Sequence, residues 1–156
     1  MAIGITVDLT PLRNKLKQVV AVTGNARPFL ELAGAEAIRM VRDKFQQQGP
    51  GWRELSERTK MNRRNKSVFR ILEDNGTLRR SIVTPASSPG GVYDLKDTSL
   101  VIGSNLVYAA IHQFGWPSGG KHPPPTIPAR PYLPTPAEMI PRIAAKLQRY
   151  LKEQIT

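Results

Sequence analysis

A glycine–lysine loop is the first feature of this sequence that could do chemistry. Residues 115–121, Gly-Trp-Pro-Ser-Gly-Gly-Lys, have the glycine and lysine spacing of a phosphate-binding loop. His122 then stands where a serine or threonine would bind magnesium, and three prolines follow where a helix would present its N–H groups. Because proline has no N–H to donate, nucleotide binding is disfavoured.

His112 and His122 are the only histidines of the chain. A metal site would need a third ligand such as Asp94 or Asp97, and no ligand spacing supports one. His112 lies in an apolar stretch, which is typical of a hydrogen-bonded structural histidine. The absence of cysteine excludes disulfides and thiolate catalysis, and no G-x-S-x-G motif is present. We therefore expect no catalytic residue, no metal and no cofactor.

Positive charge is concentrated in the middle of the chain. The formal net charge is +11, of which +5 falls on residues 53–80, and the sequence pI is about 10.5. A run from Arg58 to Arg70 contains six cations and no acid, so it attracts polyanions or acidic partners. The alternative is a solvated, mobile loop over residues 57–67. The candidate contacts are Arg58, Lys60, Arg63, Arg64 and Lys66.

Aromatic residues and one arginine are candidate partner contacts. Trp52 follows a Gly-Pro-Gly turn, where it either anchors the loop to the core or contacts a partner. Trp116 lies in a glycine- and proline-rich loop, where burial is harder to arrange. Arg130, held between an alanine and a proline, could bind a carboxylate of a neighbouring subunit or make the same contact within its own chain. We predict a subunit or partner interface at Trp116, Arg130 and Tyr132.

Helical periodicity and capping signals predict four helices in this sequence. One helix is predicted from Thr10-Pro11 to Gly24, and a second from Pro28 to about Gln48. A short helix is expected over residues 107–114. The C-terminal helix has a capping box at residues 135–138, although Pro141 could delay its regular part.

Residues between the helices predict a small antiparallel sheet. Residues 78–84 are predicted to be a strand, and 92–95 with 99–103 a hairpin. Residues 52–66 are predicted to be a loop, and 68–72 a strand or one helical turn. The excursion 115–131 holds six of the fourteen prolines and should be extended and stiff. The prediction is a single α+β domain over residues 1–156: two N-terminal helices, a small antiparallel β-sheet, a Pro-rich extended loop and a C-terminal helix.

Several motifs in a fixed order resemble the phage virion morphogenesis family, the tail completion proteins of contractile-tailed phages and prophages. The resemblance covers roughly residues 10 to 153, and the long basic loop and the GWPSGGKHPPP insertion depart from it. The motifs are Pro50-Gly51-Trp52, Ile71-Leu72, Ser81-Ile82, Ile102-Gly103-Ser104, His112-Gln113-Phe114-Gly115 and Ile127-Pro128-Ala129-Arg130-Pro131-Tyr132-Leu133.

The resemblance implies a non-enzymatic structural protein that acts late in tail assembly, completes the tail end and promotes head–tail joining. It implies other tail or neck proteins as partners, a homo-oligomer such as a ring, and a place in the virion tail or neck after assembly in the host cytoplasm. No apolar run approaches the roughly 20 residues of a membrane span, and the N-terminus lacks signal-peptide features. The alternative function is basic, non-specific DNA binding, although no recognisable DNA-binding module is present.

Overall fold

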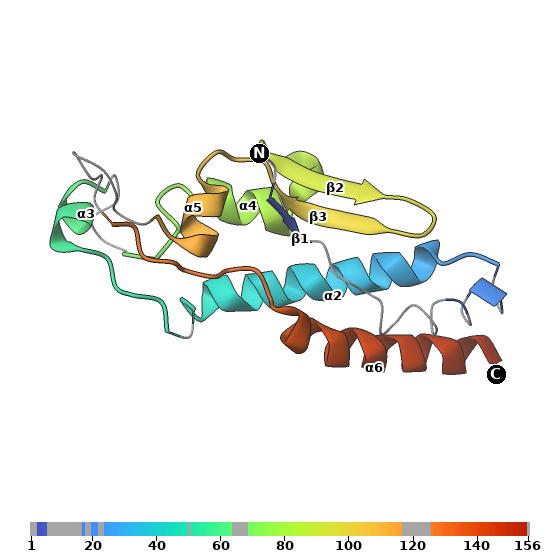
Figure 1. The fold of residues 1–156 in the computed structure, drawn as a ribbon. Helices are drawn as coiled ribbons and strands as arrows, with labels where there is room; N and C mark the ends of the chain where they lie inside the picture. The colour runs from blue at the N-terminus through green and yellow to red at the C-terminus, as the bar shows by residue number, and fades with distance from the viewer. Residues whose placement is uncertain are drawn as a thin grey trace.

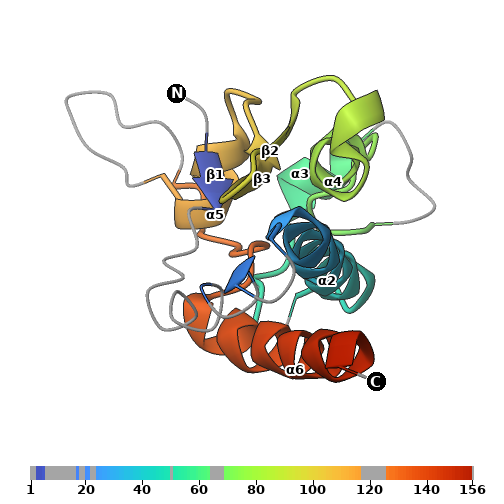
Figure 2. The same cartoon turned by 90° about the vertical axis from the view of Figure 1, so that its right-hand side faces the viewer.

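A long central helix organises the computed structural model, which describes residues 3–5, 17, 20–21, 24–49, 51–63, 69–116 and 126–155. This helix, α2 (Arg27–Gln46), is the middle layer (Figure 1). Helix α6 (Pro136–Ile155) packs along one side of it, and a sheet with a short helix covers the other. Figure 2 shows α6, α2 and the sheet layer stacked in this order. The arrangement confirms the predicted α+β class.

Helix α2 has two apolar faces because both of its sides are covered. One face packs against α6 in a cluster of Phe29, Ala33, Ala37, Met40, Met139, Ile143 and Leu147. The other face contributes Val41 and Phe45 to a second cluster beneath the sheet. The helix predicted from Pro28 to about Gln48 is confirmed within two residues at its C-terminal end.

A buried carboxylate links α2 to α6. Glu36 is 4% exposed, although it lies on the helix face that otherwise buries alanine and methionine. Both of its oxygens accept hydrogen bonds from Arg39, at 2.7 and 3.1 Å. Arg142 and Lys146 of α6 approach it to 3.7 and 3.8 Å. The hydrogen bond from Arg39 is the main reason why the pKa of Glu36 is lowered, and the two α6 cations add to it.

An aromatic group joins the end of α2 to the segment before α6. The ring of Phe45 lies 5.7 Å from that of Trp52 and 5.8 Å from that of Tyr132. Trp52 donates its Nε1–H to the carbonyl of Pro131 at 3.1 Å. Gly49 has a φ of +64°, and a Cβ there would lie 2.0 Å from the Trp52 ring, so only glycine fits. Trp52 thus anchors the loop to the core, the first of the two alternatives that the sequence left open.

In the described part of the chain, the sheet has three antiparallel strands in the order β1-β3-β2. They are β1 (Ile3–Ile5), β2 (Gly91–Leu95) and β3 (Leu100–Ser104). The predicted hairpin is confirmed, and β1, which is too short to show an alternating pattern, was not predicted. A Cβ at Gly34 would lie 2.5 Å from the Leu100 side chain, so this glycine lets β3 pack closely on α2.

The strand predicted at residues 78–84 is wrong, because this segment is helix α4 (Thr77–Val83). Asn75 accepts a hydrogen bond from the N–H of Thr77 at 3.1 Å, and Gly76 precedes the helix with a φ of +72°. Leu78 and Ile82, four residues apart, then both point into the core. Packing of this helical face outweighs the strand preference of the Ile82-Val83 pair.

The loop predicted at residues 52–66 is also partly wrong, since Glu57–Met61 forms the short helix α3. Ser56 caps it by accepting a hydrogen bond from the N–H of Thr59 at 3.3 Å. Residues 69–72 form coil and a turn rather than a strand, and residues 85–87 form a single 3-10 turn, η1 (Pro85–Ser87).

The remaining helices follow the predictions closely. Helix α5 (Ala109–Phe114) confirms the short helix at residues 107–114. The capping box is confirmed, because Glu138 accepts from the N–H of Thr135 at 2.6 Å. Helix α6 therefore begins at Pro136, and the expectation that Pro141 delays it is wrong. Most of the predicted helix 10–24 lies outside the described residues, but Lys17, Val20 and Ala21 are helical and Gly24 follows with a φ of +69°.

Candidate functional site

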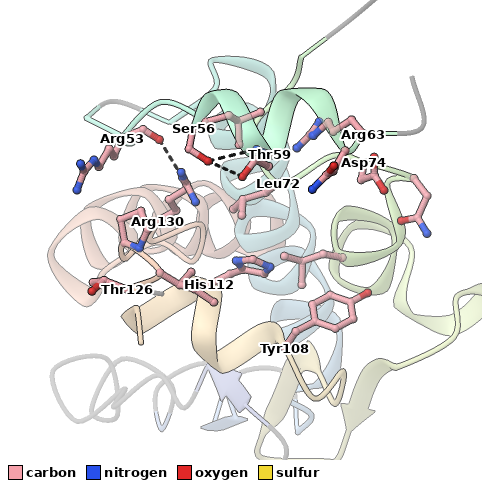
Figure 3. Close-up of a pocket in the computed structure, with 16 residues that line it drawn as sticks. Arg53, Ser56, Thr59, Arg63, Leu72, Asp74, Tyr108, His112, Thr126 and Arg130 are labelled. Carbon is pink, nitrogen blue, oxygen red and sulfur yellow. Dashed lines mark hydrogen bonds between the residues drawn. The ribbon is translucent and has the colours of Figure 1, made fainter. Parts of the chain in front are cut away.

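A cavity of about 1030 Å³ lies between segments that are far apart in the sequence (Figure 3). Its walls come from the loop and helix α3 after α2, the turn before α4, helix α5, and the extended segment that leads to α6. This volume is at the upper end of the range of ligand sites in proteins. The polar and charged side chains at its walls include Arg53, Ser56, Thr59, Arg63, Asp74, His112 and Arg130.

Arg130 ties two walls of the cavity together. Its Nε donates to the carbonyl of Arg53 at 2.9 Å, and its Nη2 donates to the carbonyl of Glu54 at 3.1 Å. Its backbone N–H donates to the carbonyl of His112 at 2.8 Å, which fixes the extended segment against α5. Arg130 is 7% exposed and makes these contacts within its own chain, but the acceptors are backbone carbonyls and not the carboxylate that the sequence suggested.

Two guanidinium groups at the cavity, those of Arg130 and Arg63, donate to backbone carbonyl oxygens. In the described part of the chain, no carboxylate forms an ion pair with Arg130. Arg63 likewise donates its Nη1 to the carbonyls of Arg70 and Glu73, at 2.6 and 3.2 Å. Burial lowers the pKa of Arg130, and the positive charges of Arg53 and Arg63 lower it further. The cavity therefore holds more positive than negative charge.

His112 lies beside Arg130 at the centre of the cavity (Figure 3). Its ring meets that of Tyr108 edge to face, with centroids 5.9 Å apart. Burial, followed by the charge of Arg130, lowers the pKa of His112, so the imidazole is neutral at pH 7. Its Nδ1 is buried without a hydrogen-bond partner, so the hydrogen bond expected for a structural histidine is not made by this atom. Among the described residues, no three His, Cys, Asp or Glu side chains gather as metal ligands.

Tyr132 is part of the core. It is 1% exposed, and its hydroxyl donates to the carbonyl of Ala109 at 2.9 Å. This burial raises the pKa of Tyr132. The Oε1 of Gln113 accepts hydrogen bonds from the N–H groups of Tyr132 and Leu133, at 3.0 and 3.1 Å. The subunit contact predicted for Tyr132 would need this core to open. Gln113 was not singled out from the sequence, although a polar residue in an apolar helix could have indicated its hydrogen bonds to this segment.

Large apolar side chains remain exposed around α5. Val107 is 88% exposed, Phe114 70% and Trp116 46%. Val107 lies in the turn that precedes α5, and Phe114 is the last residue of this helix. Trp116 follows two residues later, and its backbone exchanges hydrogen bonds of 2.8 and 3.2 Å with Ile127. We call Val107, Phe114 and Trp116 the α5 apolar surface; of these, the sequence predicted only Trp116.

Comparison with known protein families shows which family contains the cavity and the α5 apolar surface. A model of the phage virion morphogenesis family matches residues 7–152. The chain belongs to this family. Searches of curated proteins and of solved structures gave no match. The matched range includes both the cavity and the α5 apolar surface, and it assigns this virion morphogenesis protein a structural role in phage assembly.

The basic run of this family member is only partly free of internal contacts. Arg58 is exposed, whereas Lys60 pairs with Glu57 at 2.7 Å and Arg63 is bound to carbonyls as described above. Arg64 and Lys66 lie outside the described residues, as does most of the segment predicted to be mobile beyond α3.

Two other sequence features of this virion morphogenesis protein also lie outside the described residues. They are His122 and the glycine–lysine loop beyond Trp116. No helix in the described part of the chain has the length and apolarity that a membrane span requires.

Proposed function

We propose that this protein is a non-enzymatic subunit that completes the phage tail end and promotes stable joining of tail and head. It works by surface contacts with other copies of itself, in a ring or another closed oligomer, and with other tail or neck proteins. Its place in the particle is then the tail or neck. The α5 apolar surface supports this proposal most directly, because Phe114 and Trp116 are 70% and 46% exposed in the single chain. Aromatic side chains of this kind are the commonest anchors of protein interfaces.

The test is complementation of a phage that lacks this protein. Phe114→Ser and Trp116→Ser should each lower the yield of joined particles, counted by electron microscopy, by roughly tenfold or more, since an interface anchor contributes about 2 kcal/mol. Leu32→Ser is the matched control, because Leu32 is 41% exposed on α2 and lies outside this surface. Normal joining by folded Phe114→Ser and Trp116→Ser proteins would contradict the proposal.

Non-specific DNA binding is the second candidate, supported by the net charge of +11. Because Lys60 and Arg63 are engaged within the chain, we expect weak binding that falls steeply with salt. Affinity for random duplex DNA measured at two salt concentrations tests this. Tight, sequence-selective binding at physiological salt would favour the DNA-binding function over tail completion.

A further inference from the structure

We infer that the cavity beside α5 binds an acidic segment of a partner polypeptide, whose carboxylate lies against the guanidinium groups of Arg53, Arg63 and Arg130. The inference rests on the proposed assembly function, because a neighbouring tail or neck protein supplies the segment. It adds to that function a second contact, between a partner carboxylate and the arginines of the cavity, which is separate from the α5 apolar surface.

Charge is the first argument. Among the described residues that line the cavity, three are arginines and Asp74 is the single carboxylate. Arg130 is 7% exposed, yet its bonds are to backbone carbonyls, which carry only partial negative charge. A cation withdrawn from water without an ionic partner costs free energy. A carboxylate that enters the cavity would offset this cost, since charge-assisted hydrogen bonds are about twice as strong as neutral ones.

Free donor groups are the second argument. Arg130 uses its Nε and Nη2 within the chain, and Arg63 uses one Nη1 for both of its carbonyl contacts. Each guanidinium has further N–H groups, because arginine carries five. Ser56 and Thr59, whose hydroxyls share a hydrogen bond of 2.8 Å at the rim, add donors that can turn toward an oxygen ligand.

The walls favour a polypeptide over DNA. Leu55, Leu72 and Ile127 line the same cavity, so a ligand meets apolar as well as cationic surface. A peptide segment with acidic and apolar side chains matches both. Duplex DNA presents its phosphates on the outside of a wide rod, and proteins contact them with exposed cations. A guanidinium as buried as that of Arg130 is poorly placed for such contacts.

The test uses the purified full chain and three probes. The first probe is an end-blocked hexapeptide of alternating leucine and glutamate, the second is its glutamine counterpart, and the third is a short thymidine oligonucleotide. Binding is followed by NMR at the side chains of His112 and Tyr108. The glutamate peptide should shift these signals in a saturable way, and the glutamine peptide should not. Equal effects of the two peptides, tighter binding of the oligonucleotide, or no shift with any probe would each overturn the inference.

Variants locate the binding. Arg53→Gln removes a lining charge but keeps the backbone carbonyl that Arg130 needs, so the fold is preserved. It should weaken binding of the glutamate peptide roughly threefold. Arg58→Gln is the matched control, because it makes the same change at an exposed residue that does not line the cavity, and it should leave affinity unchanged. Asp74→Asn removes the opposing charge and should tighten binding, and a weaker complex would contradict the charge argument.

The same variants separate this inference from the proposed function. Phe114→Ser should lose head–tail joining and still bind the glutamate peptide. Arg53→Gln should bind the peptide more weakly and show a smaller loss of joining. If the peptide fails to bind while Phe114→Ser still abolishes joining, the cavity inference is wrong and the assembly function stands.

Discussion

Replacing Arg130 by alanine should destabilise the fold, and it should weaken assembly by the surviving folded protein only modestly, because Arg53 and Arg63 still line the cavity. The change deletes two hydrogen bonds, from Nε to the carbonyl of Arg53 and from Nη2 to the carbonyl of Glu54. Hydrogen bonds from a charged donor contribute roughly 1.5–3 kcal/mol each. Arg53 and Glu54 are exposed, however, so water can replace part of both contacts. Removal of a buried cation close to Arg53 and Arg63 also relieves repulsion.

The net loss is therefore about 2 kcal/mol in the free energy of unfolding. For a chain of 156 residues this corresponds to a fall in Tm of roughly 4–8 °C. Arg130→Lys keeps the charge but lacks the planar fork, so it should fall between alanine and the wild type. Arg58→Ala, at an exposed arginine, should change stability by less than about 0.5 kcal/mol.

Thermal and urea unfolding, measured together with head–tail joining, distinguish an internal brace from a subunit contact at Arg130. A destabilised Arg130→Ala protein whose joining at low temperature falls no further than that of Arg53→Gln confirms the internal brace. An unchanged Tm together with lost joining would refute it and restore the subunit contact that the sequence suggested.

Two further predictions concern buried ionisable groups. Glu36→Ala should lower the free energy of unfolding by about 2–3 kcal/mol in urea denaturation, because Arg39, Arg142 and Lys146 then repel one another without a shared carboxylate; no change would show that the cluster is screened by water. The pKa of His112 is lowered below 6.5 in the folded state, so the unfolded chain binds the proton more readily. The free energy of unfolding should therefore fall as pH drops below about 6.5, and in His112→Gln it should change less between pH 7 and 5. An equal pH dependence of the free energy of unfolding in both proteins would contradict this.

Local patterns predicted the elements whose own residues determine them. Helix α2 has a long apolar stripe, the hairpin has two strand-like runs around a turn, and the start of α6 is determined by the Thr135–Glu138 capping box. In each case the pattern that predicts the element lies within the same stretch of sequence. Helix α4 was mistaken for a strand because its seven residues show too little periodicity, and only the core decides that Leu78 and Ile82 share a face.

The candidate site was harder to predict because its residues meet only in the folded chain. The rigid surroundings of Arg130 were visible in the sequence, but the carbonyls that it binds lie 76 and 77 residues away. Tyr132 and Trp116 had similar sequence surroundings, yet one is 1% and the other 46% exposed. Gln113 binds the backbone of Tyr132 at the core, whereas Trp116 is held to Ile127 through its backbone.

The brace and the charge of the cavity have a common origin in Arg130. If two carbonyls only had to be held together, a neutral donor could do so without the cost of burying a cation. Arginine does so while it keeps its charge and further N–H groups. Since the carbonyls leave that charge largely uncompensated, the fold places a positive site beside the neutral ring of His112. Under the proposed inference, the carboxylate of an acidic partner segment binds this fixed and uncompensated guanidinium, which loses little conformational entropy on binding.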